Sequence, residues 1–202
     1  MTIPYTPYAY TFRYGDLEIS GEMNAALMPM LYRYPQMPIG CYVLSKVNDS
    51  LRKNVVMQIS RQLKDLPQQQ AVDRLLQFVQ SAFGYATDDE QHGFEKPYFF
   101  EEMLFYPQCD CEDRSIFYSY LLRNALGVEN QVIGYPGHEA VAVHLDAPIS
   151  GDGYISRGKK FYVSDPTYIG SVTGMCMPDF RSIRPKIDYY EYEYTGNPQS
   201  PR

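Results

Sequence analysis

The chain has 202 residues, a net charge of −6, 45% hydrophobic residues and 21% charged residues. This composition is typical of a globular protein long enough to bury a substantial core. The negative charge argues against a nucleic-acid-binding surface, and no apolar run approaches the roughly 20 residues of a membrane-spanning helix.

The N-terminal sequence has neither a basic segment nor an apolar segment, so it does not predict a signal peptide. A complete chain would therefore be expected in the cytoplasm, whereas a fragment could come from a periplasmic or exported protein. The four cysteines form no disulfide framework at this length, and we expect them to be mostly reduced. The sequence does not indicate an oligomeric state.

Residues 1–66 are predicted to form an N-terminal extension of strands and helices. Strict alternation from Tyr8 to Tyr14 predicts a strand, and Gly15-Asp16 predicts a turn after it. The other elements expected here are a strand at 17–20, a helical segment at 23–31, a short strand at 41–45, and a helix that begins at Asp49 or Ser50 and ends near Leu66.

Residues 67–187 are predicted to form the main core, and residues 188–202 a C-terminal strand followed by a flexible tail. Helical spacing of apolar residues predicts a helix over 71–83, followed by a polar loop over 84–97. Further on, we expect a short helix at 98–106, strands at 131–135, 139–145 and 159–164, and a turn region at 146–158.

The segment from Gln108 to Gly127 predicts a helix with a cysteine in its first turn. Asp110 is a favourable N-cap, and Gly127 is a favourable residue just beyond the C-terminal end. Cys111 then lies where the free N–H groups and the positive end of the helix dipole favour a thiolate. The sequence therefore predicts a lowered thiol pKa and a nucleophilic cysteine.

Two later strands supply possible partners for this cysteine. His138 stands at the start of one predicted strand, and Asp165 follows the end of another, just before Pro166. Antiparallel pairing of these strands would bring both side chains to the same end of a sheet. A cysteine, a histidine and an acid in these places are the nucleophile, base and orienting group of covalent catalysis.

Other residues offer alternatives to this assignment. Cys109 could compete as a nucleophile, and the Cys-x-Cys pair could serve redox chemistry or half a zinc site with His138 or His144. No second pair of closely spaced cysteines supports a zinc site, so we expect no metal. We interpret His144 as structural and His92 as a loop residue that could only touch substrate. Asp113 is expected to serve the helix end.

The order of helix-tip cysteine, histidine and aspartate resembles the transglutaminase-like superfamily of cysteine acyl-transfer enzymes. Asp-Cys-Glu-Asp-Arg-Ser around Cys111, Gly-His at His138 and Ser-Asp-Pro-Thr at Asp165 are similar to the family's three motifs. The resemblance covers residues from about 70 to 180. Cys109 departs from it, because a small residue often stands there, and the chain has no Trp to donate to an oxyanion.

The resemblance implies an α+β fold with a papain-like core, in which a nucleophile helix packs on an antiparallel sheet. It implies that Cys111, His138 and Asp165 form a catalytic triad acting on peptide or amide substrates, with hydrolysis favoured, as in compact bacterial members. No cofactor is expected. Gln91 and Tyr98 are candidates for donating to the oxyanion or touching substrate. Protein crosslinking and a non-catalytic binding or scaffold role are the alternatives.

Overall fold

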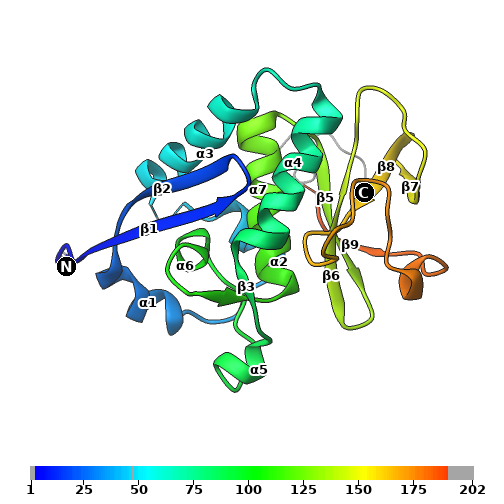
Figure 1. Ribbon diagram of the computed structural model, residues 1–202. Helices are drawn as coiled ribbons and strands as arrows, with labels where there is room; N and C mark the ends of the chain where they lie inside the picture. Colours follow the sequence, from blue (N-terminus) through cyan, green and yellow to red (C-terminus); the bar gives the residue numbers. More distant parts are fainter. Residues whose placement is uncertain (1–2, 47, 191–202) are drawn as a thin grey trace, which may run out of the picture.

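The computed structural model describes residues 3–46 and 48–190 of the chain. The protein is a mixed α and β structure in which one helix, α7 (Cys111–Leu126), runs between a sheet and a layer formed by the N-terminal half (Figure 1). The predicted α+β class is therefore confirmed. The expected strand and tail beyond residue 190 lie outside the described residues.

The main sheet has five strands, and every neighbouring pair in it is antiparallel. Side chains alternate along β6 between two buried clusters: Val141 and Val143 face the main core, while Ala140 and Ala142 face a smaller one. The strands, in their order across the sheet, are β7 (Gly153–Ser156), β8 (Lys159–Ser164), β6 (His138–Val143), β5 (Asn130–Tyr135) and β9 (Lys186–Tyr189).

Helix α7 follows the sequence signals closely. Asp110 and Asp113 form a reciprocal capping box at its start, and Gly127 ends it in the left-handed conformation with φ of 66°. Phe117, Tyr118 and Leu121 are fully buried along it. The helix contacts β5 and β6 on one side and α2, α3 and α4 on the other, so both layers fix its position.

The N-terminal 66 residues share the main hydrophobic core with α4 and α7. The predicted hairpin is present, and its second strand is longer than expected because the alternation of buried residues continues to Met23. The elements of this half are β1 (Pro7–Tyr14), β2 (Leu17–Asn24), a 3-10 turn (Ala25–Leu27), α1 (Met28–Tyr32), α2 (Ile39–Leu44), α3 (Asp49–Leu63) and α4 (Gln68–Ala82).

The strand predicted at 41–45 is wrong. This segment belongs to helix α2, which begins after Pro38 and buries Tyr42 and Val43. Short apolar runs fit either structure, and contacts with α7 and β9 favour the helix here. The cap of α3 is also one residue earlier than predicted, since the Asn48 side chain accepts from the Leu51 N–H.

Two predicted loops contain short regular elements. The polar loop at 84–97 holds β3 (Gly84–Tyr85) and α5 (Asp88–Gln91), and the turn region at 146–158 holds β7. Strand β3 pairs in parallel with β4 (Gln108–Cys109), immediately before α7. The helix expected at 98–106 is shorter, as α6 (Phe100–Met103), and a 3-10 turn (Pro178–Phe180) precedes β9.

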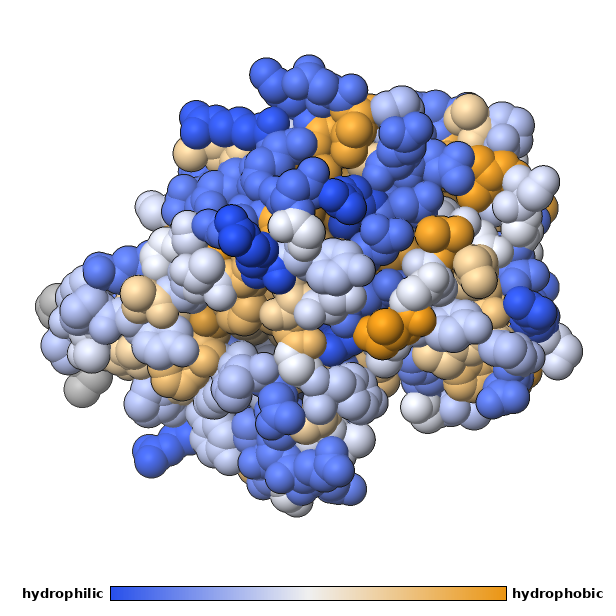
Figure 2. Space-filling model, viewed as in Figure 1, coloured by the Kyte–Doolittle hydropathy of each residue, from blue (hydrophilic) through white to orange (hydrophobic). Residues whose placement is uncertain are grey.

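The face seen in Figure 2 is mainly hydrophilic, with hydrophobic side chains in separate small groups. Within residues 3–46 and 48–190, no helix combines the length and the apolar character that crossing a membrane would require.

Candidate active site

Cys111 is the first residue of α7 and is half-buried. Its position follows from Asp110, whose side chain accepts a hydrogen bond from the Asp113 N–H and so fixes where the helix begins. Asp113 in turn accepts bonds from the N–H groups of Tyr98 and Asp110, at 2.6 and 3.2 Å. The structural role predicted for Asp113 is therefore confirmed.

His138 is the first residue of β6, directly after a two-residue turn. The turn is Pro136-Gly137, and Gly137 has a φ of 69°, a conformation that residues other than glycine rarely adopt. Tyr135 and His138 pair across this turn. The histidine is thus held at the very end of the sheet, where β5 passes into β6.

Asp165 follows β8 and is buried, with 1% of its surface exposed. Its Oδ2 lies 2.8 Å from His138 Nε2, and its Oδ1 accepts from the N–H groups of Thr167 and Tyr168. The antiparallel pairing of β6 with β8 brings the two residues together, as the sequence predicted. Both carboxylate oxygens are held, so the imidazole has a fixed partner.

The Cys111 side chain meets this pair from the helix side. The backbone N–H of Glu139, the residue after His138, lies close enough to the Cys111 sulfur to favour its thiolate and so to lower its pKa. The thiol itself donates to Glu112 Oε2 at 3.3 Å. The structure therefore gathers the three residues that the sequence singled out at the junction of α7, β6 and β8.

The electrostatic surroundings of Cys111 differ from the prediction. Burial raises the pKa of the Cys111 thiol, the Glu112 carboxylate raises it further, and only the Glu139 N–H opposes them. Burial and the charge of Glu112 also raise the pKa of Asp110, to about 7. The expected lowering of the thiol pKa is therefore wrong, because the sequence argument considered the helix dipole and not the neighbouring acids.

Two buried polar residues that the sequence analysis missed hold the Asp165 loop in place. The Gln80 amide, from α4, donates to the carbonyl oxygens of Asp165 and Tyr168 at 3.0 and 2.9 Å. The Arg114 guanidinium, from α7, donates to the carbonyl oxygens of Phe83 and Pro166. For both residues, the signal in the sequence was a long polar side chain within a predicted helix that has many apolar positions.

An aromatic stack supports the outer side of the histidine. The ring of Phe180 lies nearly parallel to that of His138, with centroids 5.2 Å apart, and it also stacks with the ring of Tyr135, at 4.8 Å. A pocket of about 410 Å³ opens beside this stack. It is lined by Tyr135 and Phe180 together with Tyr154, Ile155, Arg181 and Arg184.

The hydrogen bonds of the Gln91 and Tyr98 side chains engage groups other than Cys111. The Gln91 amide donates to the Ala86 carbonyl, and the buried Tyr98 hydroxyl lies 2.7 Å from His92 Nε2. Gln91 and His92 line a hollow of about 620 Å³ together with Tyr85 and Gln108. Gln91 is thus placed to touch a ligand in that hollow, while Tyr98 supports His92 from beneath.

Cys109 and His144 have structural surroundings. Cys109 is buried against Gly84 and Arg114, and burial raises its pKa to about 12. Cys176 is buried and Cys41 is exposed. His144 binds the Lys160 carbonyl through Nδ1 at 2.9 Å, which fits the structural role predicted for it.

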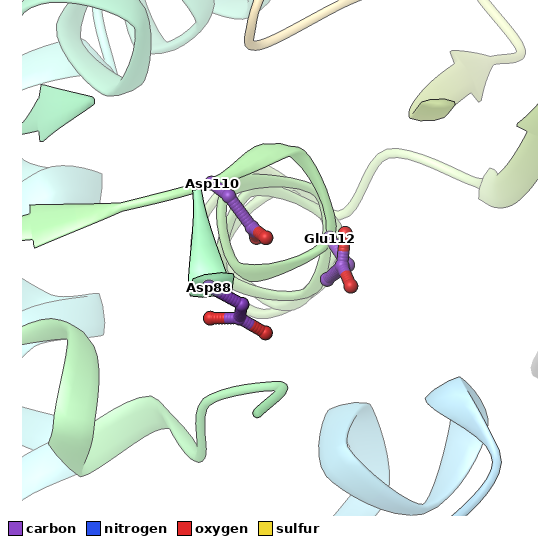
Figure 3. A group of neighbouring side chains, drawn as sticks. All are labelled: Asp88, Asp110 and Glu112. Atoms are coloured by element: carbon purple, nitrogen blue, oxygen red, sulfur yellow. The ribbon is translucent and has the colours of Figure 1, made fainter. Parts of the chain in front are cut away.

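Among the described residues, one group of side chains is placed so that it could hold a metal ion, and it consists of three carboxylates. Oxygens of Asp88, Asp110 and Glu112 lie within 4.8 Å of one another beside the first turn of α7 (Figure 3).

Comparison of the sequence with models of known protein families gives no match, and comparison with curated proteins gives none either. The resemblance to the transglutaminase-like superfamily stays a prediction that depends on the three motifs.

Proposed function

We propose that the protein is a cysteine-dependent acyl-transfer enzyme that hydrolyses peptide or amide bonds through a thioester. The hydrogen bond of 2.8 Å between His138 Nε2 and the buried carboxylate of Asp165, next to Cys111 at a helix start, carries this proposal. A surface histidine would not need a buried acid whose other oxygen is held by two N–H groups.

The pairing assigns a role to each nitrogen of the imidazole. With Nε2 bound to Asp165, Nδ1 is the nitrogen that exchanges a proton with the Cys111 sulfur. Because the surroundings raise the thiol pKa, the proton moves to His138 as the sulfur attacks the carbonyl carbon, rather than beforehand. Asp165 stabilises the imidazolium that results.

The rest of the reaction needs no other reactant than water. The C–N bond breaks as the imidazolium gives its proton to the leaving amine, which leaves a thioester on Cys111. His138 then takes a proton from water, the hydroxide attacks the thioester, and the acid and the free thiol are released. The backbone N–H of Cys111, at the start of α7, is our candidate donor to the oxyanion.

We further infer that α7 and the five-stranded sheet are a papain-like core of the transglutaminase-like type. A helix that begins with the cysteine and packs on β6, the strand that begins with the histidine, supports this inference. The pocket beside Phe180, the residue that stacks on His138, and the hollow beside Gln91 are our candidate binding sites for parts of an extended substrate, such as a peptide.

Trapping the acyl-enzyme tests the proposal. The protein is mixed with p-nitrophenyl acetate, quenched within seconds, and the acetylated residue is located by tandem mass spectrometry. We expect the acetyl group on Cys111 and a burst of nitrophenol, both lost in Cys111→Ser. His138→Ala should slow the burst by roughly 10²-fold or more, as expected when a general base is removed.

Cys41 is the internal control, because it is an exposed thiol far from the proposed machinery in the chain. Equal acetylation of Cys41 and Cys111, unchanged in His138→Ala, would contradict the proposal. A peptide library, with and without added amine, then separates hydrolysis from crosslinking.

A further inference from the structure

The pocket beside Phe180 combines apolar walls with charged side chains. Its volume of about 410 Å³ is near the lower end of the roughly 300–1,000 Å³ of small-ligand pockets, so it has room for one large side chain and the adjoining backbone. Most of the apolar wall is formed by Tyr135, Tyr154, Ile155, Val163 and Phe180. The charged side chains are those of Asp152, Arg181 and Arg184.

The apolar wall includes the edge of the main sheet. Strand β7 is the outermost strand at this edge, and Tyr154 and Ile155 belong to it (Figure 1). Tyr154 is held in place, because its hydroxyl donates to Gln131 Oε1 at 2.7 Å. Ile155 and Ile183 are 60% and 38% exposed, so an apolar ligand in the pocket would remove from water a surface that the folded chain leaves exposed.

The segment 178–185 closes the pocket on the side of the histidine. The N–H groups of Phe180 and Ile183 donate to the carbonyl oxygens three residues before them, both at 3.0 Å, so the segment is a series of hydrogen-bonded turns. The ring of Phe180 stacks with the rings of His138 and Tyr135. One side chain thus both lines the pocket and contacts the proposed base.

The two arginines of the pocket differ in their partners. Arg181 Nε lies 3.3 Å from Asp152 Oδ2, and this carboxylate also accepts from the Cys176 N–H at 3.0 Å. Arg184 is exposed and has no ion pair or hydrogen bond with any residue in the described part of the chain. Two arginines and one aspartate leave one net positive charge in the pocket, although the whole chain has a net charge of −6.

From these observations we infer that the pocket binds an aromatic side chain of the substrate together with a carboxylate next to it. The inference rests on the proposed function, since it treats this ligand as part of a substrate. The aromatic ring packs against Tyr135, Ile155 and Phe180, and the carboxylate pairs with Arg184, whose planar guanidinium matches the two oxygens of a carboxylate.

The place of the pocket sets where this aromatic residue stands in the substrate. The centroids of Phe180 and His138 are 5.2 Å apart, and one extended residue spans about 3.3–3.6 Å. The aromatic residue therefore lies close to the bond that is cleaved. Its neighbouring carboxylate is either the C-terminus of the substrate or the side chain of an adjacent acidic residue.

Binding of a tryptophan-containing probe tests the inference, because the chain itself has no tryptophan. N-acetylglycyltryptophan and its C-terminal amide are titrated into the Cys111→Ser protein, and the fluorescence of the probe is followed. We expect the acid to bind roughly tenfold more tightly than the amide, since the amide lacks the charge that pairs with Arg184. Unlabelled N-acetylglycylphenylalanine should displace the probe far better than N-acetylglycylalanine does.

A second pair of probes identifies the source of the carboxylate. Each probe continues for one residue beyond the tryptophan and ends in an amide, and that residue is aspartate in one probe and asparagine in the other. Tighter binding of the aspartate probe assigns the carboxylate to an acidic side chain, whereas a preference found only with the first pair assigns it to a C-terminus. Either result supports the inference.

Two substitutions in the Cys111→Ser protein separate the two parts of the pocket. Arg184→Gln should bind the acid and the amide equally. Ile155→Ala changes an exposed side chain and should weaken the binding of both by roughly threefold or more, without altering their ratio. Arg33→Gln is the matched control: it makes the same change at an exposed arginine outside the pocket and should retain the full preference for the acid.

Three results would overturn the inference. They are the failure of either carboxylate probe to bind more tightly than its amide, a preference that persists in Arg184→Gln, and equal displacement by the phenylalanine and alanine compounds. These readouts need no thiol. A preference for the acid in a protein whose Cys111 is never acetylated would therefore count against the proposed function alone, and an acetylated Cys111 without this preference would count against the inference alone.

Discussion

The two sides of the candidate active site are built in opposite ways. On the sheet side, His138 has a buried acid at 2.8 Å and a parallel aromatic ring at 5.2 Å, and the acid's other oxygen is held by backbone N–H groups. On the helix side, Cys111 lies among carboxylates whose charge opposes its ionisation. The base is therefore fully oriented, whereas the nucleophile depends on what neutralises its neighbours.

Removing the acid from the sheet side should have the largest effect. Asp165→Asn retains the oxygen that accepts from Thr167 and Tyr168 but no longer stabilises a charged imidazole. We expect kcat for ester or amide hydrolysis to fall by roughly 10⁴-fold, as when the acid of a catalytic triad is replaced by an amide.

Asp179→Asn, in the exposed turn before β9, is the control and should retain full activity. Thermal unfolding of both variants shows whether the fold is kept. Full activity in Asp165→Asn would show that the ordered sheet side does not serve catalysis.

Neutralising one acid on the helix side should increase the reactivity of the site, in contrast to the loss expected on the sheet side. Because the Glu112 carboxylate raises the pKa of the Cys111 thiol, Glu112→Gln should lower it, by an amount on the order of one unit. Alkylation of Cys111 by iodoacetamide at pH 7 in EDTA should then be about tenfold faster. The rate at each cysteine is followed by mass spectrometry, with the exposed Cys41 as the reference. An unchanged ratio of the two rates would mean that the acids do not control the nucleophile.

A smaller effect, on the stability of the protein, is expected from replacing Glu139, the residue that follows His138. Burial, and then the charge of Asp188, raise its pKa from 4.5 to about 8. Between these values the unfolded chain has lost a proton that the folded chain retains, so this group makes the protein less stable as the pH rises. Glu139→Gln should therefore be more stable than the native chain at pH 8, by on the order of 1 kcal/mol after solvent screening.

Urea unfolding at pH 4 and pH 8 checks this expectation. The two proteins should be nearly equal at pH 4, where Glu139 is protonated in both states. A stability difference that is the same at both pH values would rule out titration of Glu139 as its source.

The sheet side could be predicted from sequence because its signals are local. The alternation in β6 and β8 and the residues at their ends were enough to place His138 beside Asp165. The helix side could not be predicted in this way, because Asp88 lies near Asp110 only as a result of the pairing of β3 with β4. Each of these strands has two residues, and their sequences have no pattern that would reveal the pairing. Helix α2 was missed for a similar reason, since packing rather than periodicity decides its conformation.

The two-residue turn before His138 also constrains how the protein can vary in length. Tyr135 and His138 face each other across Pro136-Gly137, and the side chains of a strand alternate between faces. One residue inserted between this turn and Val141 would send the imidazole to the opposite face and away from Asp165. Insertions are far easier to accept in the segment between β6 and β7, which lies at the other end of β6. Divergent copies of this chain should therefore differ in size there and keep the His138 hairpin unchanged in length.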